Sequence, residues 1–423
     1  MTMKLRNRLI ALICLILFLG LGAALFLSTS ARKPFAVILF VSDNITTSCL
    51  TSARLFSGGG DAKLQLEDFP NTALCRNAAN DFSIPESASA STALAAGKRV
   101  NRGSLCIDPS GTKLPSILEI AAAKGRSTGL ITTGLITGAT AAAYYAKSIN
   151  AEDQSDLAAQ FLHHAPFDVV IGSDLESSTP SSTNASNTQK YSLEQLKTND
   201  VVLVRSMSEL EKQPLWKSAP VLGLLAPSQL SLTHSGEGDT NAPSLSDLVR
   251  LAIRHLQSNR HGYFLVVDDP SIGKAAGAND AETMFKRILA FDQAVATARR
   301  YAGDNALIIV SGRETIGGLQ LNGYPFLGDK GVAILSLNAQ GNPSLCWATG
   351  PGFALDEKND PAPQGKKTKP TASGILAQPS AHTLPQGLGV AGDVLALGVG
   401  PGSEKIKGFL DLTDVNHLIE QGL

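Results

Sequence analysis

Ser87 stands at the head of a run of small residues, directly after Pro85 and Glu86, in the segment SIPESASASTALAAG. Pro85 suits the entry to a helix and Gly97 its end, so the run predicts a helix with Ser87 in its N-terminal region. The unpaired N–H groups and the positive pole of the dipole at that end can hold a phosphoryl oxygen beside a serine nucleophile. A serine near a helix start is more often a cap, so both interpretations stay open.

Acidic residues end several apolar runs of the chain. Asp43 follows VILFVS, Asp174 follows VVIGS, and Asp268 and Asp269 follow YFLVV. Ligands of open parallel sheets gather beyond the carboxyl ends of the strands, so acids placed there can converge on a metal ion. Solvated carboxylates at strand ends are common, so no single one of these acids indicates a site by itself.

The elements that must position these residues alternate between apolar strand-like runs and helical patterns from Phe35 onward. This order predicts an α/β fold with a mostly parallel central sheet flanked by helices. The clearest helices cover 244–258 and 280–303, the second beginning at an aspartate and ending at a glycine. The predicted strands are 35–43, 127–133, 167–174, 262–269, 305–312 and 393–400.

The bulk properties indicate one globular domain over residues 34–423, with loop insertions near 176–200 and 355–381 that are rich in Ser, Thr and Asn or in Pro and Lys. No internal repeat is found. The 423-residue chain has a formal net charge of −1. Nucleic-acid binders usually carry a basic face, so the sequence argues against a nucleic acid as partner.

Residues 1–33 predict a signal peptide or a membrane anchor. Lys4, Arg6 and Arg8 precede an uncharged stretch over 9–27, which is about the length of roughly 20 residues that crosses a bilayer. The basic residues in front place the remainder outside the cytoplasm, in the periplasm or another extracytoplasmic space. Cleavage after STSA and retention in the inner membrane are both open.

Export makes disulfides an option for the cysteines of the folded part. Cys75 and Cys106 each lie in a short strand-like run, so they are candidates for a bridge across neighbouring strands. Free buried thiols are the equal alternative, because spacing alone does not establish connectivity.

Six separated blocks of the chain resemble the alkaline phosphatase family, in order and spacing from about Phe35 to near the C-terminus. The blocks are VILFVSD, ESASASTALAAGKRVNRGSLCID, LPSILEIAAAKGRSTGLITTGLITGATAAAYYA, GYFLVVDD, ILAFDQAVATARRYAGDNALIIVSG, and AHTLPQ with VLALGVGPGS. The resemblance implies an α/β sandwich with a serine nucleophile, two catalytic zinc ions and one magnesium ion. It also implies hydrolysis of phosphate monoesters outside the cytoplasm, by proteins that are often homodimers.

Five positions match the functional residues of the family. Ser87 matches the nucleophile that forms the phosphoserine, and Asp43 matches the aspartate shared by the second zinc and the magnesium. Thr140, in GATAAA, matches the hydroxyl of the magnesium site, and Asp268 falls where that site normally has Glu. His382, in AHTLP, matches the last histidine of the first zinc site.

Other positions depart from the family pattern. Gly273 and Gly277 stand where the family has a zinc-binding Asp and His, and Arg313 and Glu314 stand at its consecutive Asp-His. Zinc sites of this kind need about three protein donors each, so both zinc sites are predicted to be lost. Asp43, Thr140 and Asp268 remain candidates for Mg²⁺, which accepts two carboxylates and several waters.

Arg313 stands where the family has a zinc ligand, and two interpretations of its role follow. Its guanidinium either binds a phosphoryl oxygen of the substrate through a fork of hydrogen bonds, or pairs with Glu314 and other neighbours and fills the space.

The sequence therefore favours a degenerate phosphatase that binds or acts on phosphate monoesters with lost or weak hydrolysis. One alternative is an active metal-dependent phosphomonoesterase, with replacement ligands such as Asp269, Asp280, Glu314 or a relocated histidine. The other is a non-catalytic envelope protein that uses the scaffold to bind a phosphorylated ligand or a partner.

Overall fold

The computed structural model describes the chain in segments. They are residues 11–21, 36–164, 167–173, 201–213, 219–226, 243–322, 326–336, 342–352 and 378–423. The chain divides into two compact units, Met1–Pro34 and Phe35–Leu423. Most of both predicted loop insertions falls outside the described residues.

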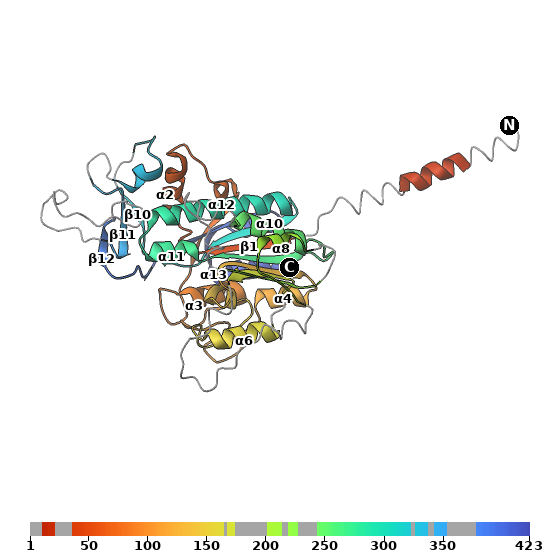
Figure 1. Cartoon of the computed structure of the whole chain (residues 1–423), viewed down its shortest axis with the longest axis horizontal. Helices are drawn as coiled ribbons and strands as arrows, with labels where there is room; N and C mark the ends of the chain where they lie inside the picture. The colour runs from red at the N-terminus through yellow and green to blue at the C-terminus, as the bar shows by residue number, and fades with distance from the viewer. Residues whose placement is uncertain are drawn as a thin grey trace. The chain divides into compact units, whose positions relative to one another are not determined.

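A ten-stranded sheet forms the centre of the larger unit (Figure 1). Its strands are β1 (Ala36–Ser42), β2 (Asn71–Arg76), β3 (Ser127–Leu135), β4 (Val169–Ser173), β5 (Val202–Val204), β6 (Val221–Leu225), β7 (Tyr263–Asp269), β8 (Ala306–Gly312), β14 (Val394–Val399) and β15 (Gly408–Asp411). The strand order is β15-β2-β14-β8-β1-β7-β3-β4-β6-β5, and of these ten strands β14 alone runs antiparallel to its neighbours. The predicted α/β fold with a mostly parallel sheet is confirmed, and each of the six predicted strands forms.

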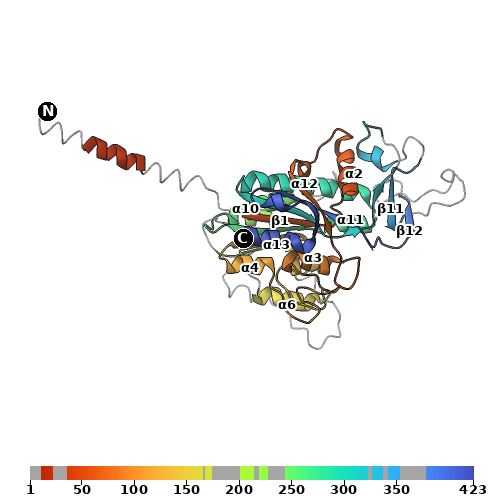
Figure 2. The ribbon, with the colours of Figure 1, turned by 180° about the vertical axis from the view of Figure 1, so that it is seen from behind.

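Helices cover both faces of the sheet. They are α2 (Thr47–Gly58), α3 (Ser87–Ala96), α4 (Ile117–Ala123), α5 (Ala139–Ala142), α6 (Gln154–His164), α8 (Met207–Glu211), α10 (Leu245–Leu256), α11 (Ser271–Gly277), α12 (Ala281–Ala302) and α13 (Leu412–Gly422), with short 3-10 turns η1 (Gln65–Asp68), η3 (Gly331–Leu335) and η4 (Ser403–Lys405). Helices α2, α10, α11 and α12 lie on one face, and α3, α4, α6 and α13 lie on the other (Figures 1 and 2). The sheet is therefore shielded on both sides, as parallel sheets require.

The central strand β1 shows how the two layers arise. All seven of its residues are buried, because helices pack on both sides. Successive side chains of a strand point to opposite faces. Ile38 and Phe40 join the core under α10 and α12, where the Phe40 ring meets Phe291 edge-on at 5.5 Å, while Leu39 and Val41 join the core under α3 and α4.

The predicted helix over 280–303 forms as α12. The side chain of Asp280 accepts a hydrogen bond from the backbone N–H of Thr283 at its start, and Gly303 follows its last turn with a φ of 72°. Asp280 and Gly303 therefore cap the two ends of α12, as the sequence predicted.

Two small sheets lie beyond the central one. Strands β10 (Gln320–Leu321), β11 (Leu345–Gly350) and β12 (Ser380–Thr383) form one, and β9 (Thr315–Ile316) pairs with β13 (Gly389–Val390) in the other. β9 begins three residues after β8 ends, so the second of these sheets continues directly from the carboxyl end of a central strand.

In the N-terminal unit the structure describes a helix over residues 11–21. Within the described residues, no helix combines the length and the apolar character that crossing a bilayer requires. The rest of the predicted segment 1–33 lies outside the described residues, so the choice between signal peptide and anchor stays a prediction.

The cysteines are all free thiols in the structure. Cys75 lies on β2, and the Cys106 thiol donates to the backbone carbonyl of Ala143 at 3.1 Å. Burial raises the pKa of Cys75 to about 12 and that of Cys106 to about 11. Of the two alternatives drawn from the sequence, the structure shows free buried thiols rather than a bridge between Cys75 and Cys106.

We predict that Cys75 and Cys106 resist a thiol-specific disulfide reagent at pH 8, because burial denies the reagent access and keeps both thiols protonated. The half-buried Cys346 reacts in the native protein, and Cys75 and Cys106 react only after unfolding in urea. Mass spectrometry of modified peptides measures each site. A Cys75–Cys106 cross-linked peptide from a non-reduced digest would contradict the structure.

Candidate active site

The carboxyl ends of four neighbouring strands bring the candidate residues together. In the register of the sheet, Asp268 of β7 lies beside Val41 of β1 and Thr132 of β3. Ser42, the last residue of β1, lies beside Gly312, the last residue of β8. Asp43 and Arg313 each come one residue later, so Asp43, Asp268 and Arg313 leave the sheet at the same edge, as the sequence predicted for Asp43 and Asp268.

A buried ion pair occupies this edge. Nε and Nη2 of Arg313 donate to Oδ1 and Oδ2 of Asp43, each at 2.7 Å. The Arg313 side chain is 1% exposed, and its Nη1 lies 3.9 Å from Oδ1 of Asp268 and 3.5 Å from the Ser91 hydroxyl. Burial acts to lower the pKa of the guanidinium, but Asp43 and Asp268 raise it above its ordinary value. Arg313 is therefore a permanent cation inside the protein.

Asp268 is a second buried carboxyl in the same cluster. Its Oδ2 accepts a hydrogen bond from the Thr132 hydroxyl at 2.7 Å, while its Oδ1 has no hydrogen-bond partner in the structure. Burial raises the pKa of Asp268 to about 7, although the charge of Arg313 opposes the shift. Burial therefore favours the neutral form of Asp268 more than it does for an exposed aspartate.

Ser87 is the first residue of α3, and it is half-buried. The cap of this helix is Glu86, whose carboxylate accepts hydrogen bonds from the backbone N–H groups of Ala88 and Ser89. The interpretation of Ser87 as the cap is therefore wrong. Its hydroxyl instead donates to Oε1 of Glu314 at 2.6 Å.

Glu314 belongs to the segment that leaves β8. It is 5% exposed, and its carboxylate lies 4.0 Å from Nε of Arg313. Burial, together with the nearby Asp43 carboxylate, raises the pKa of Glu314 to about 7, although the charge of Arg313 and the hydrogen bond from Ser87 oppose the shift. The backbone carbonyl of Glu314 accepts from the N–H of Asn44, so its position is fixed to the end of β1.

Helix α11 closes over Asp43 through a glycine. A Cβ atom at Gly273 would lie 2.1 Å from Oδ2 of Asp43, a separation that atoms in proteins do not show. Any side chain at this position would displace either the helix or the carboxylate. At Gly277, one of the nearest atoms is Nε2 of the flexible Gln386 side chain, at 3.2 Å.

The two remaining predicted site residues lie on other elements. Thr140 is 4% exposed on the four-residue helix α5. His382 is exposed on β12, where its backbone pairs with Thr349 in one of the small sheets. The Asp43–Arg313 ion pair and the Ser87–Glu314 hydrogen bond show no link to either residue among the described contacts.

Thr132, Ser91 and Glu86 are parts of this site that were not assigned a role from the sequence. Thr132 could have been found, since it is the next-to-last residue of the predicted strand 127–133, as Asp268 is of the predicted strand 262–269. The Glu86 cap could not, because glutamate is not among the preferred capping residues.

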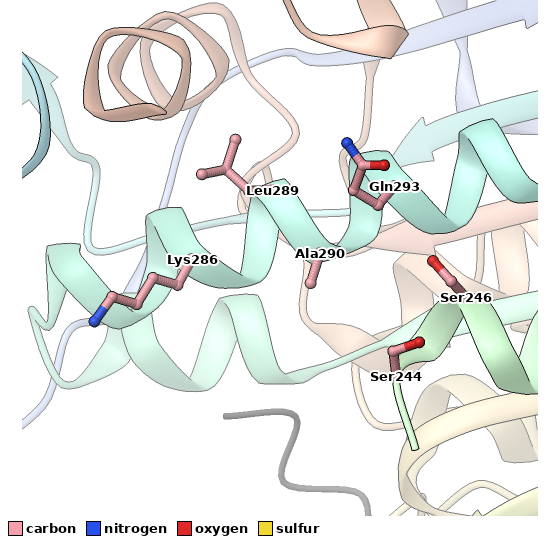
Figure 3. A pocket seen from close by; sticks show the side chains of 6 residues that line it. All are labelled: Ser244, Ser246, Lys286, Leu289, Ala290 and Gln293. Atoms are coloured by element: carbon pink, nitrogen blue, oxygen red, sulfur yellow. The ribbon is translucent and has the colours of Figure 1, made fainter. Parts of the chain in front are cut away.

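A pocket with other lining residues lies between α10 and α12, on the face of the sheet that these helices cover (Figure 3). Its lining residues are Ser244, Ser246, Lys286, Leu289, Ala290 and Gln293. Ser244 is the cap of α10, and Lys286 pairs with Glu282 at 2.8 Å. Two of its four polar side chains, Ser244 and Lys286, are thus engaged in helix structure.

A family model described as alkaline phosphatase matches residues 35–423. The chain belongs to the alkaline phosphatase family. Alkaline phosphatase 4 of Drosophila melanogaster is 25% identical over 447 residues, covering 90% of this chain and 75% of the relative. Alkaline phosphatase 4 of Bacillus subtilis is 28% identical over 298 residues, covering 67% of this chain and 62% of the relative.

Solved structures confirm the alkaline-phosphatase-like fold. The enzyme of the Antarctic bacterium TAB5 superposes with a TM-score of 0.69 at 21% identity, covering 92% of this chain and 98% of the other. The alkaline phosphatase of Thermus thermophilus superposes with a TM-score of 0.69 at 21% identity, covering 93% of this chain and 92% of the other. A variant of the TAB5 enzyme is described with magnesium bound in its M3 site.

The residues of this chain do not fit the zinc and magnesium ions that the family implies. Arg313 engages both oxygens of Asp43 and places a fixed positive charge where a divalent cation would need that carboxylate. Such a charge repels a metal ion from Asp268 as well. Among the described residues, no group of three or more His, Cys, Asp or Glu side chains is arranged to hold a metal ion.

Each of the acids suggested as a replacement ligand accepts hydrogen bonds from the protein. Asp280 caps α12. Asp269 follows Asp268 on β7 and so points to the other face of the sheet, where Oδ1 accepts hydrogen bonds from the hydroxyls of Thr133 and Ser271. Glu314 accepts from Ser87. The described contacts of this site therefore centre on the guanidinium of Arg313.

We predict that Arg313→Met lowers the free energy of unfolding by about 3–5 kcal/mol, because it leaves Asp43 buried without its counter-ion. The double variant Asp43→Asn/Arg313→Met loses less than the sum of the two single variants. Urea unfolding measures all three. Arg54→Met, which removes a partly exposed pair with Glu67 at 2.7 Å, is the control and changes stability by less than about 1 kcal/mol. Additivity at 43 and 313 would contradict the ion pair.

We predict that Gly273→Ala destabilises the protein by about 1–3 kcal/mol, because the added methyl group overlaps the Asp43 carboxylate. Gly277→Ala, on the same helix, is the matched control and leaves stability within about 1 kcal/mol of the parent, since alanine favours the helix and the nearby glutamine moves. Thermal unfolding compares the two. Equal effects of both substitutions would show that α11 does not pack on Asp43 as described.

Proposed function

We propose that this family member has lost, or retains only weakly, two-metal hydrolysis of phosphate monoesters, while keeping the serine and the scaffold of a phosphate-ester site. Family membership supports a phosphatase-like function. The observation that carries the proposed loss is the bidentate contact of Arg313 with both oxygens of Asp43.

The chemical reason lies in what metals contribute to phosphoryl transfer. They activate the nucleophile and stabilise charge on the attacking and leaving oxygens, effects worth several kcal/mol. A guanidinium supplies positive charge but does not activate a hydroxyl by coordination. With its fork held by Asp43, Arg313 acts as a counter-ion, and the predicted contact with a phosphoryl oxygen would require it to leave that carboxylate.

The basic N-terminus and the uncharged stretch after it support export, with the domain outside the cytoplasm and either cleaved free or anchored. A phosphate ester is the ligand class that the family suggests. A homodimer remains a prediction from family resemblance.

We predict that the full-length chain, supplied with Zn²⁺ and Mg²⁺ at alkaline pH, hydrolyses an aryl phosphate no faster than its Ser87→Ala variant, because Ser87 has no metal to activate it. Release of the phenol measures the rate, and elemental analysis of dialysed protein measures bound zinc. Ser83→Ala, at an exposed serine just before the same helix, is the matched control.

Two zinc ions per chain, together with turnover that Ser87→Ala abolishes and Ser83→Ala preserves, would establish the active metal-dependent phosphomonoesterase instead. Absent turnover in a protein without bound zinc supports the loss of two-metal hydrolysis, whether the chain is a degenerate phosphatase or a non-catalytic envelope protein. Calorimetry with inorganic phosphate measures separately whether the site still binds the free anion.

A further inference from the structure

We propose that Ser87 and Glu314 form a metal-independent nucleophile and base pair that reacts with uncharged phosphoryl electrophiles rather than with phosphate dianions. This inference deepens the proposed function. It rests on the proposed loss of zinc, because a serine that no zinc ion activates depends on a protein base. The family motif supplies no such base, because Glu314 stands at a position where the family has another residue type.

The geometry of the pair is that of an activated nucleophile. Oγ of Ser87 donates to Oε1 of Glu314 at 2.6 Å, within the reach required of a general base. Ser87 is half-buried and so is reachable, whereas Glu314 is 5% exposed and shielded from water. The ten-residue helix α3 begins at Ser87, and its dipole favours negative charge developing on this oxygen.

The base is held in place by the sheet. The N–H of Arg313 donates to the carbonyl of Ser42 at 3.0 Å, and the carbonyl of Glu314 accepts from Asn44 at 2.8 Å. Both contacts continue the pairing of β8 with β1 beyond the strands. The Glu314 carboxylate therefore meets Ser87 because two rigid elements place it there, as a preorganised catalytic contact requires.

The charges around Ser87 select against an anionic substrate. The Glu86 carboxylate already occupies the N–H groups of Ala88 and Ser89, which an anion at this helix start would need. Glu314 contacts Ser87, and Glu86, the residue before Ser87, lies near enough to Glu314 for its charge to raise the pKa of that carboxyl. The cation of the cluster, Arg313, is committed to Asp43. A phosphate dianion meets repulsion from these carboxylates, and an uncharged phosphoryl group does not.

The covalent step balances without a metal or a redox partner. Oγ of Ser87 forms a bond to phosphorus as the bond from phosphorus to its leaving group breaks. The Oγ proton passes to Oε1 of Glu314, and the leaving group departs with the bonding electron pair. With a fluorophosphonate as electrophile the products are a phosphonylated Ser87, a protonated Glu314 and fluoride.

The test uses the full-length chain and an uncharged alkyl fluorophosphonate. Intact-protein mass spectrometry follows the rate of labelling, and peptide sequencing locates the label. We expect labelling at Ser87 that Ser87→Ala removes and Ser83→Ala preserves. Glu314→Gln keeps the side-chain shape and slows labelling about 100-fold, within the range that a positioned base contributes. Glu282→Gln, at a carboxylate on α12 that pairs with Lys286, labels at the parental rate.

Inorganic phosphate at millimolar concentration is then added as a competitor, and we expect it to give no protection. Labelling of Ser87 at an unchanged rate in Glu314→Gln, or no labelling of Ser87, overturns the base assignment. Protection by phosphate overturns the preference for uncharged groups. Glu314→Asp provides the same comparison should the glutamine variant not fold, because the shorter side chain withdraws the carboxylate from Ser87. Zinc content and aryl phosphate turnover report on the proposed function separately.

Discussion

The ion pair between Arg313 and Asp43 is the interaction on which the arrangement of this site depends. Two charges removed from water are tolerated only when each meets the other in good geometry, and the two 2.7 Å contacts satisfy that condition. The guanidinium also lies within 4.0 Å of Asp268 and Glu314. One cation thus stabilises three buried carboxyls, which no neutral side chain at this position would do.

The order of the strands brings the charged side chains of this site to one edge of the sheet. Because β1 lies between β7 and β8, Asp43 leaves the sheet next to the ends of both strands. Gly273 then allows α11 to close over the carboxylate, since no Cβ fits there. Burial follows, and with it the raised pKa of Asp268. The fold therefore determines both where the acids meet and how strongly they need a counter-ion.

Sequence reasoning succeeds where a single local signal decides the structure. The apolar runs predict the strands, and Asp280 and Gly303 predict the limits of α12, because periodicity and caps act over a few residues. It fails where the outcome depends on distant partners. Whether Arg313 faces a substrate or Asp43 is decided by contacts 270 positions apart along the chain, and the hydrogen bond of Ser87 depends on Glu314 in the same way.

The two residues that follow β8 are complementary. If Glu314 were absent, the hydroxyl of Ser87 would lose its hydrogen-bond acceptor, which lies 2.6 Å away. If Arg313 were absent, the carboxylates of Glu314 and Asp43 would repel each other. The charge of the guanidinium offsets this repulsion. The pair Arg-Glu thus places an internal cation against Asp43 and a hydrogen-bonded carboxylate against Ser87. In the proposed function, these two side chains stand in for the positive charge and the serine activation that metal ions would supply. The positive charge of Arg313 is already matched before any ligand arrives.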